Sequence, residues 1–174
     1  LILAQVLPAG APRVALVSFG VASLDLGLAC MYLFTREVYR RDLAWLQSIT
    51  TLPILVKGVV RGDDALLAIE HGAAGVIVSN HGGRQLDTAI ATARALPEVV
   101  NAIGGRGVVL VDGGIRRGTH VIKALAAGAK ACSGGRMYLY ALAAAGQPGV
   151  EKALGNMRSE IERDMKLMGV TKID

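Results

Sequence analysis

The sequence predicts an α/β fold built on a parallel β-sheet, of the kind found in TIM (β/α)8 barrels. Short β-branched segments alternate with amphipathic helical segments from residue 41 onward, which is the pattern of right-handed βαβ units. Hydrophobic residues make up 52% of the chain, as expected for strands that are buried on both faces. Four strand–helix units are recognisable, whereas a complete barrel needs eight and typically about 250 residues. We therefore expect about half of a barrel, over residues 41–174.

The first predicted elements are a helix, a strand and a second helix. Residues 41–50 carry apolar side chains on one stripe and predict a helix. Residues 53–59 (PILVKGV) form a short β-branched run that begins with proline, which is acceptable at the start of a strand. Residues 63–72 have acidic side chains in their first turn and end at Gly72, as helices often do.

Two further strands follow, with a loop and a helix between them. Residues 74–80 (AGVIVSN) predict a strand, and residues 81–87 (HGGRQLD) predict a loop. Residues 88–103 predict a helical stretch that Pro97 interrupts, because proline lacks the backbone donor that a helix interior needs. Residues 107–112 (GVVLVD) predict the next strand.

The remaining elements continue the alternation to the end of the chain. Residues 119–128 predict a helix after a glycine-rich turn. Residues 129–135 (AKACSGG) predict a poorer strand, since polar residues and glycine stand where apolar residues are expected. Residues 136–146 predict a helix, and residues 149–169 predict a final amphipathic helix with a charged outer face.

Residues 1–40 lack this alternation and form a separate, unassigned segment. Within them, residues 14–34 are apolar over a length sufficient to cross a bilayer, with arginines on both sides. Asp25 lies near the middle, where a charge costs roughly 2.5–3.5 kcal/mol, and no small-residue cleavage pattern of a signal peptide follows. Three interpretations stay open: a buried core segment, which we expect, contact with a membrane, or an irregular tail.

The charge and cysteine patterns argue against several classes of function. The formal net charge is +5, but the basic residues are scattered and not interleaved with aromatic residues, so we expect no nucleic-acid surface. We interpret the basic residues as a solvated surface plus a few arginines for anionic ligands. Cys30 and Cys132 lack CxxC or metal-site spacing. We therefore expect reduced thiols, no metal site and a cytoplasmic protein, at most peripheral at the membrane.

Polar residues and glycines lie at the end of every predicted strand. Because ligands bind at the carboxyl ends of parallel strands in α/β folds, these are the candidate site residues. They are Lys57, Gly58, Ser79, Asn80, His81, Gly82, Gly83, Arg84, Asp112, Gly113, Gly114, Ile115, Arg116, Gly135 and Arg136.

Three of these side chains suggest chemistry on a small anion. Lys57 interrupts an apolar strand, where it either pairs with an anion or polarised acceptor or reaches solvent. His81 directly follows a strand in a glycine-rich loop, and histidine suits general-base work near neutral pH. Arg84, three residues later, offers a planar fork for a substrate carboxylate. Base catalysis on a small carboxylate and a purely structural histidine both stay open at this point.

Two glycine-rich turns, DGGIRRG and GGR, each open a predicted helix. Backbone N–H groups at a helix N-terminus form an anion site when glycines leave them uncovered, and arginine adds positive charge. Two such turns on consecutive strands indicate one phosphate. TIM barrels commonly bind phosphate with the loops after strands 7 and 8, which is where these turns lie in a C-terminal half. The alternative is that the glycines serve only tight turns; Rossmann and P-loop motifs are absent.

Four segments together resemble the family of FMN-dependent 2-hydroxy-acid oxidases and dehydrogenases. They lie within residues 41–174 and are LPILVKGV, AGVIVSNHGGRQLD, VLVDGGIRRGTHVIKALAAGA and GRMYLYALAAAGQPGV. The resemblance implies the C-terminal half of an FMN-binding barrel. It also implies that FMN is the cofactor. The implied reaction is oxidation of an (S)-2-hydroxy acid of the lactate, glycolate or mandelate class to the 2-oxo acid. We also expect a homo-oligomer, because half of a barrel exposes two sheet edges and an apolar inner face.

The roles of single residues follow from this resemblance alone. Lys57 matches the lysine beside the flavin, where it stabilises negative charge on the reduced ring, and Ser79 matches a flavin contact. His81 matches the active-site base, and Arg84 the arginine that holds the substrate carboxylate. Asp112 matches a residue of the flavin-site segment that also supports the histidine. The expected phosphate contacts are Gly113, Gly114, Arg116, Gly135 and Arg136.

The chain also departs from the family pattern. The family's N-terminal half supplies further flavin and substrate groups that residues 1–40 do not match, so we expect the 174-residue chain to be inactive alone. Alternatives are a non-catalytic half-barrel that binds phosphate or flavin, a subunit that completes a barrel with another chain, or a different phosphate-binding barrel. The sequence leaves open the particular acid, the final electron acceptor, and hydride against carbanion chemistry.

Overall fold

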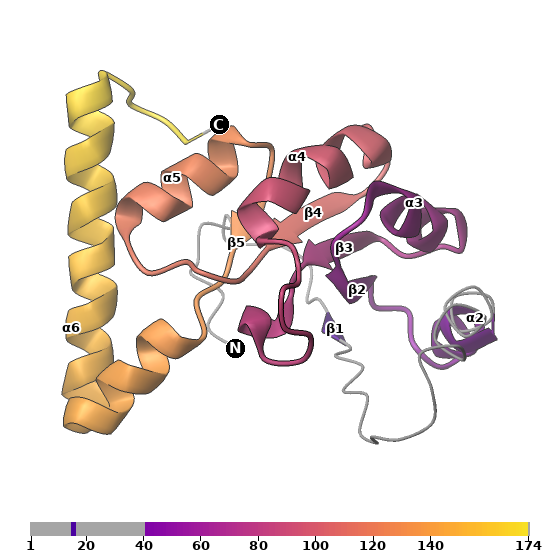
Figure 1. The fold of residues 1–174 in the computed structure, drawn as a ribbon, viewed down its shortest axis with the longest axis horizontal. Coiled ribbons are helices and arrows are strands. Elements are labelled where there is room, and N and C mark those ends of the chain that lie inside the picture. Colours follow the sequence, from indigo (N-terminus) through magenta and orange to yellow (C-terminus); the bar gives the residue numbers. More distant parts are fainter. Residues whose placement is uncertain (1–14, 17–40, 174) are drawn as a thin grey trace.

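In the computed structural model, parallel strands form a single sheet in the order β1-β2-β3-β4-β5 within the described part of the chain, residues 15–16 and 41–173 (Figure 1). Each strand pairs in parallel with the next one along the chain. The predicted parallel α/β architecture is therefore confirmed. The elements in chain order are β1 (Ala15–Leu16), α2 (Leu43–Ile49), β2 (Ile54–Val59), α3 (Gly62–Glu70), β3 (Gly75–Val78), the 3-10 turn η2 (His81–Gly83), α4 (Thr92–Ile103), β4 (Val108–Val111), α5 (Gly118–Ala126), β5 (Ala131–Cys132) and α6 (Arg136–Met168).

The core lies between the sheet and the helices that follow β2, β3 and β4. These helices, α3, α4 and α5, lie along one side of the sheet (Figure 1). Helix α4 buries Ala95, Leu96, Val99 and Ile103, whose spacing places them on one face. Strand β3 is buried at all positions from Gly75 to Val78. Helix α4 packs against β3. Because burial of each Leu or Val contributes about 1.5–3 kcal/mol, this packing holds in place the end of β3, where the site begins.

Helix α4 differs from the prediction in its start and at its proline. It begins at Thr92 rather than at residue 88, since Thr88 has a left-handed φ of 61° and Ala91 is extended. The predicted interruption at Pro97 is wrong, because helical geometry continues through it to Ile103. Pro97 and Ala93 are both exposed, so water can bind the Ala93 carbonyl that proline leaves without a donor. The buried face of the helix is unaffected.

Helix α6 consists of two helical segments that meet at Ala145 and Gly146. Ala145 has φ −153° and Gly146 has φ 59°, and neither value is helical. Figure 1 shows the resulting bend between a short first segment and a long second one. Two helices were predicted here, with the boundary at Gly146, and both are present. The second segment packs against α5.

The N-terminal segment is largely outside the described residues. Strand β1 pairs Ala15 with Ile54 of β2, and it was not predicted. The interpretations of residues 14–34 otherwise fall on residues that the structure does not describe, and the division at residue 40 stays a prediction. No helix in the described part of the chain is both long and apolar enough to cross a membrane. The cytoplasmic location also stays a prediction.

Candidate active site

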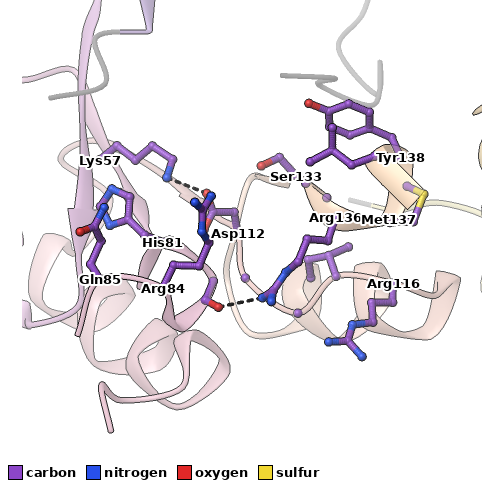
Figure 2. Close-up of a pocket in the computed structure, with 17 residues that line it drawn as sticks. Lys57, His81, Arg84, Gln85, Asp112, Arg116, Ser133, Arg136, Met137 and Tyr138 are labelled. Atoms are coloured by element: carbon purple, nitrogen blue, oxygen red, sulfur yellow. Dashed lines mark hydrogen bonds and ion pairs between the residues drawn. The ribbon is translucent and has the colours of Figure 1, made fainter. Parts of the chain in front are cut away.

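A cleft of about 310 Å³ opens at the carboxyl ends of β2, β3 and β4, beside the start of α6 (Figure 2). Every residue to which the family resemblance gave a role lines it, except Ser79. Gly58, Asn80 and Gly83, which the strand-end pattern also singled out, lie outside its lining. The lining comprises Lys57, His81, Gly82, Arg84, Gln85, Asp112, Gly113, Gly114, Ile115, Arg116, Ser133, Gly134, Gly135, Arg136, Met137, Tyr138 and Leu139.

Lys57 is a half-buried, paired lysine near the end of β2. Its Nζ donates to Ser79 Oγ at 2.9 Å and lies 2.9 Å from Oδ2 of Asp112. The Lys57 and Asp112 side chains are only 11% and 15% exposed. Of the two interpretations of Lys57, the structure therefore supports the paired ammonium. The prediction that Asp112 supports His81 stays untested, since the interaction seen for its carboxylate is with Lys57.

Gly58 forms a β-bulge that makes room for the imidazole of His81. The pairing of β2 with β3 shifts between Lys57 and Val59, and Gly58 has a left-handed φ of 103°. A Cβ atom on Gly58 would lie 3.1 Å from His81 Cε1. The ring of His81 therefore lies close to the backbone of β2. A role for Gly58 beneath the imidazole was not predicted, although a glycine inside a β-branched run often marks such a close approach.

His81 begins a left-handed turn whose backbone donors are all used within the loop. His81, Gly82 and Gly83 have φ values of 54°, 70° and 72°. For a histidine this conformation costs about 1–3 kcal/mol, so its surroundings must hold it. The His81 N–H donates to Ser79 Oγ, the Gly82 N–H to Asn80 Oδ1, and the Gly83 N–H to the Asn80 carbonyl. The turn therefore presents the imidazole to the cleft rather than backbone donors.

Two exposed side chains of the following loop reach the same end of the cleft. Arg84 and Gln85 lie near His81 and Lys57 (Figure 2). Arg84 has an exposed guanidinium that is available to a small carboxylate. Gln85 was not among the predicted site residues; its place directly after Arg84 in the glycine-rich loop is the signal that could have identified it.

The second glycine-rich turn is open toward the cleft. Gly113 and Gly114 have φ values of 86° and 83°, and Cβ atoms on Gly114 or Gly135 would meet nothing within 4 Å. Among the described residues, the N–H groups of Gly114 and Ile115 meet no acceptor. Thr92 fixes the turn from behind, because its Oγ1 donates to the Gly113 carbonyl at 3.1 Å. Such a turn suits an anion.

His120 supports this turn from helix α5. Its Nδ1 lies 3.0 Å from the Gly114 carbonyl oxygen and 3.3 Å from the backbone nitrogen of Arg116. The His120 side chain is half-buried. The spacing of six residues between Gly114 and His120 did not indicate this contact, since it depends on how α5 leaves the turn.

The two adjacent arginines of this turn have different surroundings. Arg116 lines the cleft, whereas Arg117 forms an ion pair at 2.8 Å with Glu160 of α6. The other oxygen of Glu160 accepts the N–H of Gly118, the first residue of α5, at 2.7 Å. The hydrogen bond from Arg117 is the main reason that the pKa of Glu160 lies below its ordinary value. Arg117 thus joins α5 to α6, and Arg116 is available to a ligand.

The donor set of the cleft fits a phosphate-bearing cofactor with a polar ring. Four cationic side chains face the cleft against a single carboxylate, which is that of Asp112. Lys57 and Arg84 lie near His81, and Arg116 lies beside the glycine turn (Figure 2). The fourth cation, Arg136, lies between them and is hydrogen-bonded to the Gly82 carbonyl. Arg116 and the glycine turn suit a phosphate dianion, whereas Lys57 and Arg84 suit the carboxylate of a substrate or an anionic ring. FMN meets this description.

A parallel α/β sheet with a cationic, glycine-lined cleft at its carboxyl edge defines a class of enzymes that bind phosphate-bearing ligands there. The family model described as FMN-dependent dehydrogenase matches residues 21–174. The chain belongs to this FMN-dependent family. It is 58% identical over 134 residues to glycolate oxidase of Spinacia oleracea, covering 77% of this chain and 36% of that protein.

Other relatives agree with this assignment. L-lactate oxidase of Nostoc sp. is 53% identical over 132 residues, covering 76% of this chain and 36% of the relative. Among solved structures, mandelate oxidase superposes with a TM-score of 0.72 at 44% identity, over 76% of this chain and 40% of that one. The chain thus spans little more than a third of the length of these relatives. The superposition also confirms the predicted fold class.

Proposed function

We propose that this chain carries the base, the carboxylate-binding arginine and the phosphate-binding turns of an enzyme that oxidises an (S)-2-hydroxy acid to the 2-oxo acid with FMN. The observation that carries this proposal is the gathering of His81, Arg84 and Lys57 at one end of a cleft whose other residues include Arg116 and the open glycine turn. The printed names of the relatives, glycolate oxidase and L-lactate oxidase, support a small 2-hydroxy acid as substrate.

In this proposal, the side chains near His81 position the substrate and move its proton. The guanidinium of Arg84 binds the substrate carboxylate through two parallel hydrogen bonds. The imidazole of His81 then accepts one of the two protons that the alcohol loses on oxidation. Gly58 leaves the imidazole room beside β2, and the left-handed turn directs it into the cleft. FMN, when bound, would accept the two electrons and the second proton, which balances the oxidation.

The proposed cofactor contacts lie on both sides of this centre. Gly113, Gly114, Arg116, Gly135 and Arg136 would hold the phosphate. Lys57 would place a positive charge beside the ring, and its salt bridge with Asp112 holds the side chain in position. Ser79, which is 1% exposed, would contribute by holding both Lys57 and the His81 N–H.

We further propose that the protein self-associates. Apolar side chains are exposed along the first segment of α6: Leu139 is 47% exposed, Tyr140 70% and Leu142 48%. A cluster of exposed apolar side chains of this kind suits burial against further protein surface. Size-exclusion chromatography of the full-length protein tests this part of the proposal, and a strictly monomeric protein would contradict it.

The function is tested by flavin spectroscopy on the full-length protein. FMN should bind stoichiometrically, and its visible absorbance should bleach under anaerobic conditions when L-lactate or glycolate is added. D-lactate is the matched control, because it is the opposite enantiomer, in which the hydroxyl group and the hydrogen on the α-carbon have exchanged positions. Bound FMN that no 2-hydroxy acid reduces would contradict the proposed reaction, and failure to bind FMN would contradict the cofactor site as well.

A further inference from the structure

Arg136, at the start of α6, is hydrogen-bonded to the turn that carries His81. Its Nη2 donates to the carbonyl oxygen of Gly82 at 2.7 Å, across 54 residues of sequence. Figure 2 shows this contact as a link between the His81 turn and the part of the cleft that contains Arg116. The sequence and the family resemblance assigned Arg136 only to the phosphate.

The contact supports a turn that needs support. The N–H groups of His81, Gly82 and Gly83 all donate to Ser79 or Asn80. Within the described residues, the backbone donors of the turn are therefore bound by the loop itself. The Gly82 carbonyl is held from outside the loop, by Arg136. Since His81 is in the left-handed region, an external contact of this kind limits its return to an ordinary conformation.

Gly82 is also the position that lets Arg136 approach. A Cβ atom on Gly82 would lie 2.8 Å from Nη2 of Arg136, whereas a Cβ atom on Gly83 would meet nothing within 4 Å. Both glycines have nearly the same left-handed φ, 70° and 72°. The two positions therefore differ mainly in this one contact.

We propose that Arg136 is a positioning residue that couples the cofactor phosphate to the orientation of His81. A guanidinium has five N–H donors, so one can hold the Gly82 carbonyl while others bind an anion. Arg136 lines the cleft and is exposed, which leaves those other donors accessible. The coupling rests on the proposed function, because it takes the anion to be the FMN phosphate. A bound phosphate then restricts the Arg136 guanidinium, and the guanidinium restricts the turn that carries His81.

The first test compares Gly82→Ala with Gly83→Ala in the full-length protein. Both variants place alanine in the left-handed region and carry a similar backbone cost. Only Gly82→Ala displaces Arg136, so its dissociation constant for FMN should be roughly tenfold higher than that of Gly83→Ala. Equal affinities in the two variants would overturn the coupling.

The second test needs no cofactor and compares Arg136→Lys with Arg116→Lys by amide hydrogen exchange. Each lysine keeps a positive charge, but only Arg136→Lys removes the guanidinium contact with Gly82. Exchange at His81, Gly82 and Gly83 should become roughly tenfold faster in Arg136→Lys and stay unchanged in Arg116→Lys. Equal exchange would overturn the positioning role even where FMN binds normally. A wild-type protein that binds no FMN would contradict the proposed function and the coupling together, whereas unequal exchange would still establish the contact.

Discussion

The ammonium of Lys57 lies 2.9 Å from the carboxylate of Asp112. Lys57 is in β2 and Asp112 directly follows β4, and these two strands are not neighbours in the sheet. Strand β3 separates β2 from β4, and Ser79 at the end of β3 accepts a second hydrogen bond from Lys57. The three strand ends are therefore joined through one ammonium group. Because both charged side chains are largely removed from water, each depends on the other for its stabilisation.

This dependence predicts strong coupling between Lys57 and Asp112. Lys57→Met should lower the free energy of unfolding by roughly 1–3 kcal/mol, because it leaves the Asp112 carboxylate without its partner. Adding Asp112→Asn should restore part of that loss, since the isolated charge is then gone. Urea unfolding of the two single variants and the double variant measures the coupling free energy. Additive losses would show that the pair is energetically independent.

Substitution of the two adjacent arginines of the phosphate turn should change FMN affinity to different extents. Arg116→Ala should weaken FMN binding by roughly ten- to a hundredfold, because charge-assisted contacts with a phosphate are lost. Arg117→Ala is the matched control, since Arg117 is committed to Glu160, and it should change FMN affinity by no more than about twofold. Fluorescence titration with FMN measures both. The reverse ranking would place the phosphate elsewhere.

The contact between α5 and α6 should weaken in acid. The pKa of Glu160 is lowered below its ordinary value of 4.5, chiefly by the hydrogen bond from Arg117 and also by the Gly118 N–H. A carboxyl group with a lowered folded-state pKa contributes stability above its unfolded pKa and loses it as the pH falls through the folded value. The protection of the Gly118 amide, taken as its intrinsic exchange rate divided by its observed rate, should therefore fall below the ordinary pKa of Glu160.

Glu160→Gln is the control for this pH dependence. The glutamine variant cannot titrate at this position, so its Gly118 protection should lack the acid-dependent fall that is due to Glu160. Because Arg117 is well exposed, added salt should reduce the wild-type effect. An identical acid response in the wild-type and glutamine proteins would show that another group causes it.

The positions of the strands and the candidate residues were predictable because both depend on local patterns. Each of β2, β3 and β4 is a short β-branched run, and the residues that end it must lie at one edge of a parallel sheet. This is why the sequence alone was enough to expect Lys57, His81, Asp112 and Arg136 in one cleft. The family motifs then gave each of them an expected role.

The contacts that the sequence did not predict all depend on distance through space. Lys57 reaches Asp112 across a strand, and Arg136 reaches Gly82 from the start of another helix. No periodicity encodes which of several strand-end groups will pair. Pro97 was misjudged for a related reason, since its local cost is offset by the buried face of α4, which only the fold reveals.

The most direct test of the account is the rate of flavin reduction in His81→Asn. Asparagine tolerates the left-handed backbone of residue 81, so the turn should persist while the basic imidazole is removed. Stopped-flow absorbance under anaerobic conditions, with L-lactate or glycolate, should show reduction slowed by roughly a hundred- to ten-thousandfold with FMN still bound. Reduction of bound FMN at the wild-type rate would contradict the assignment of His81 as the base.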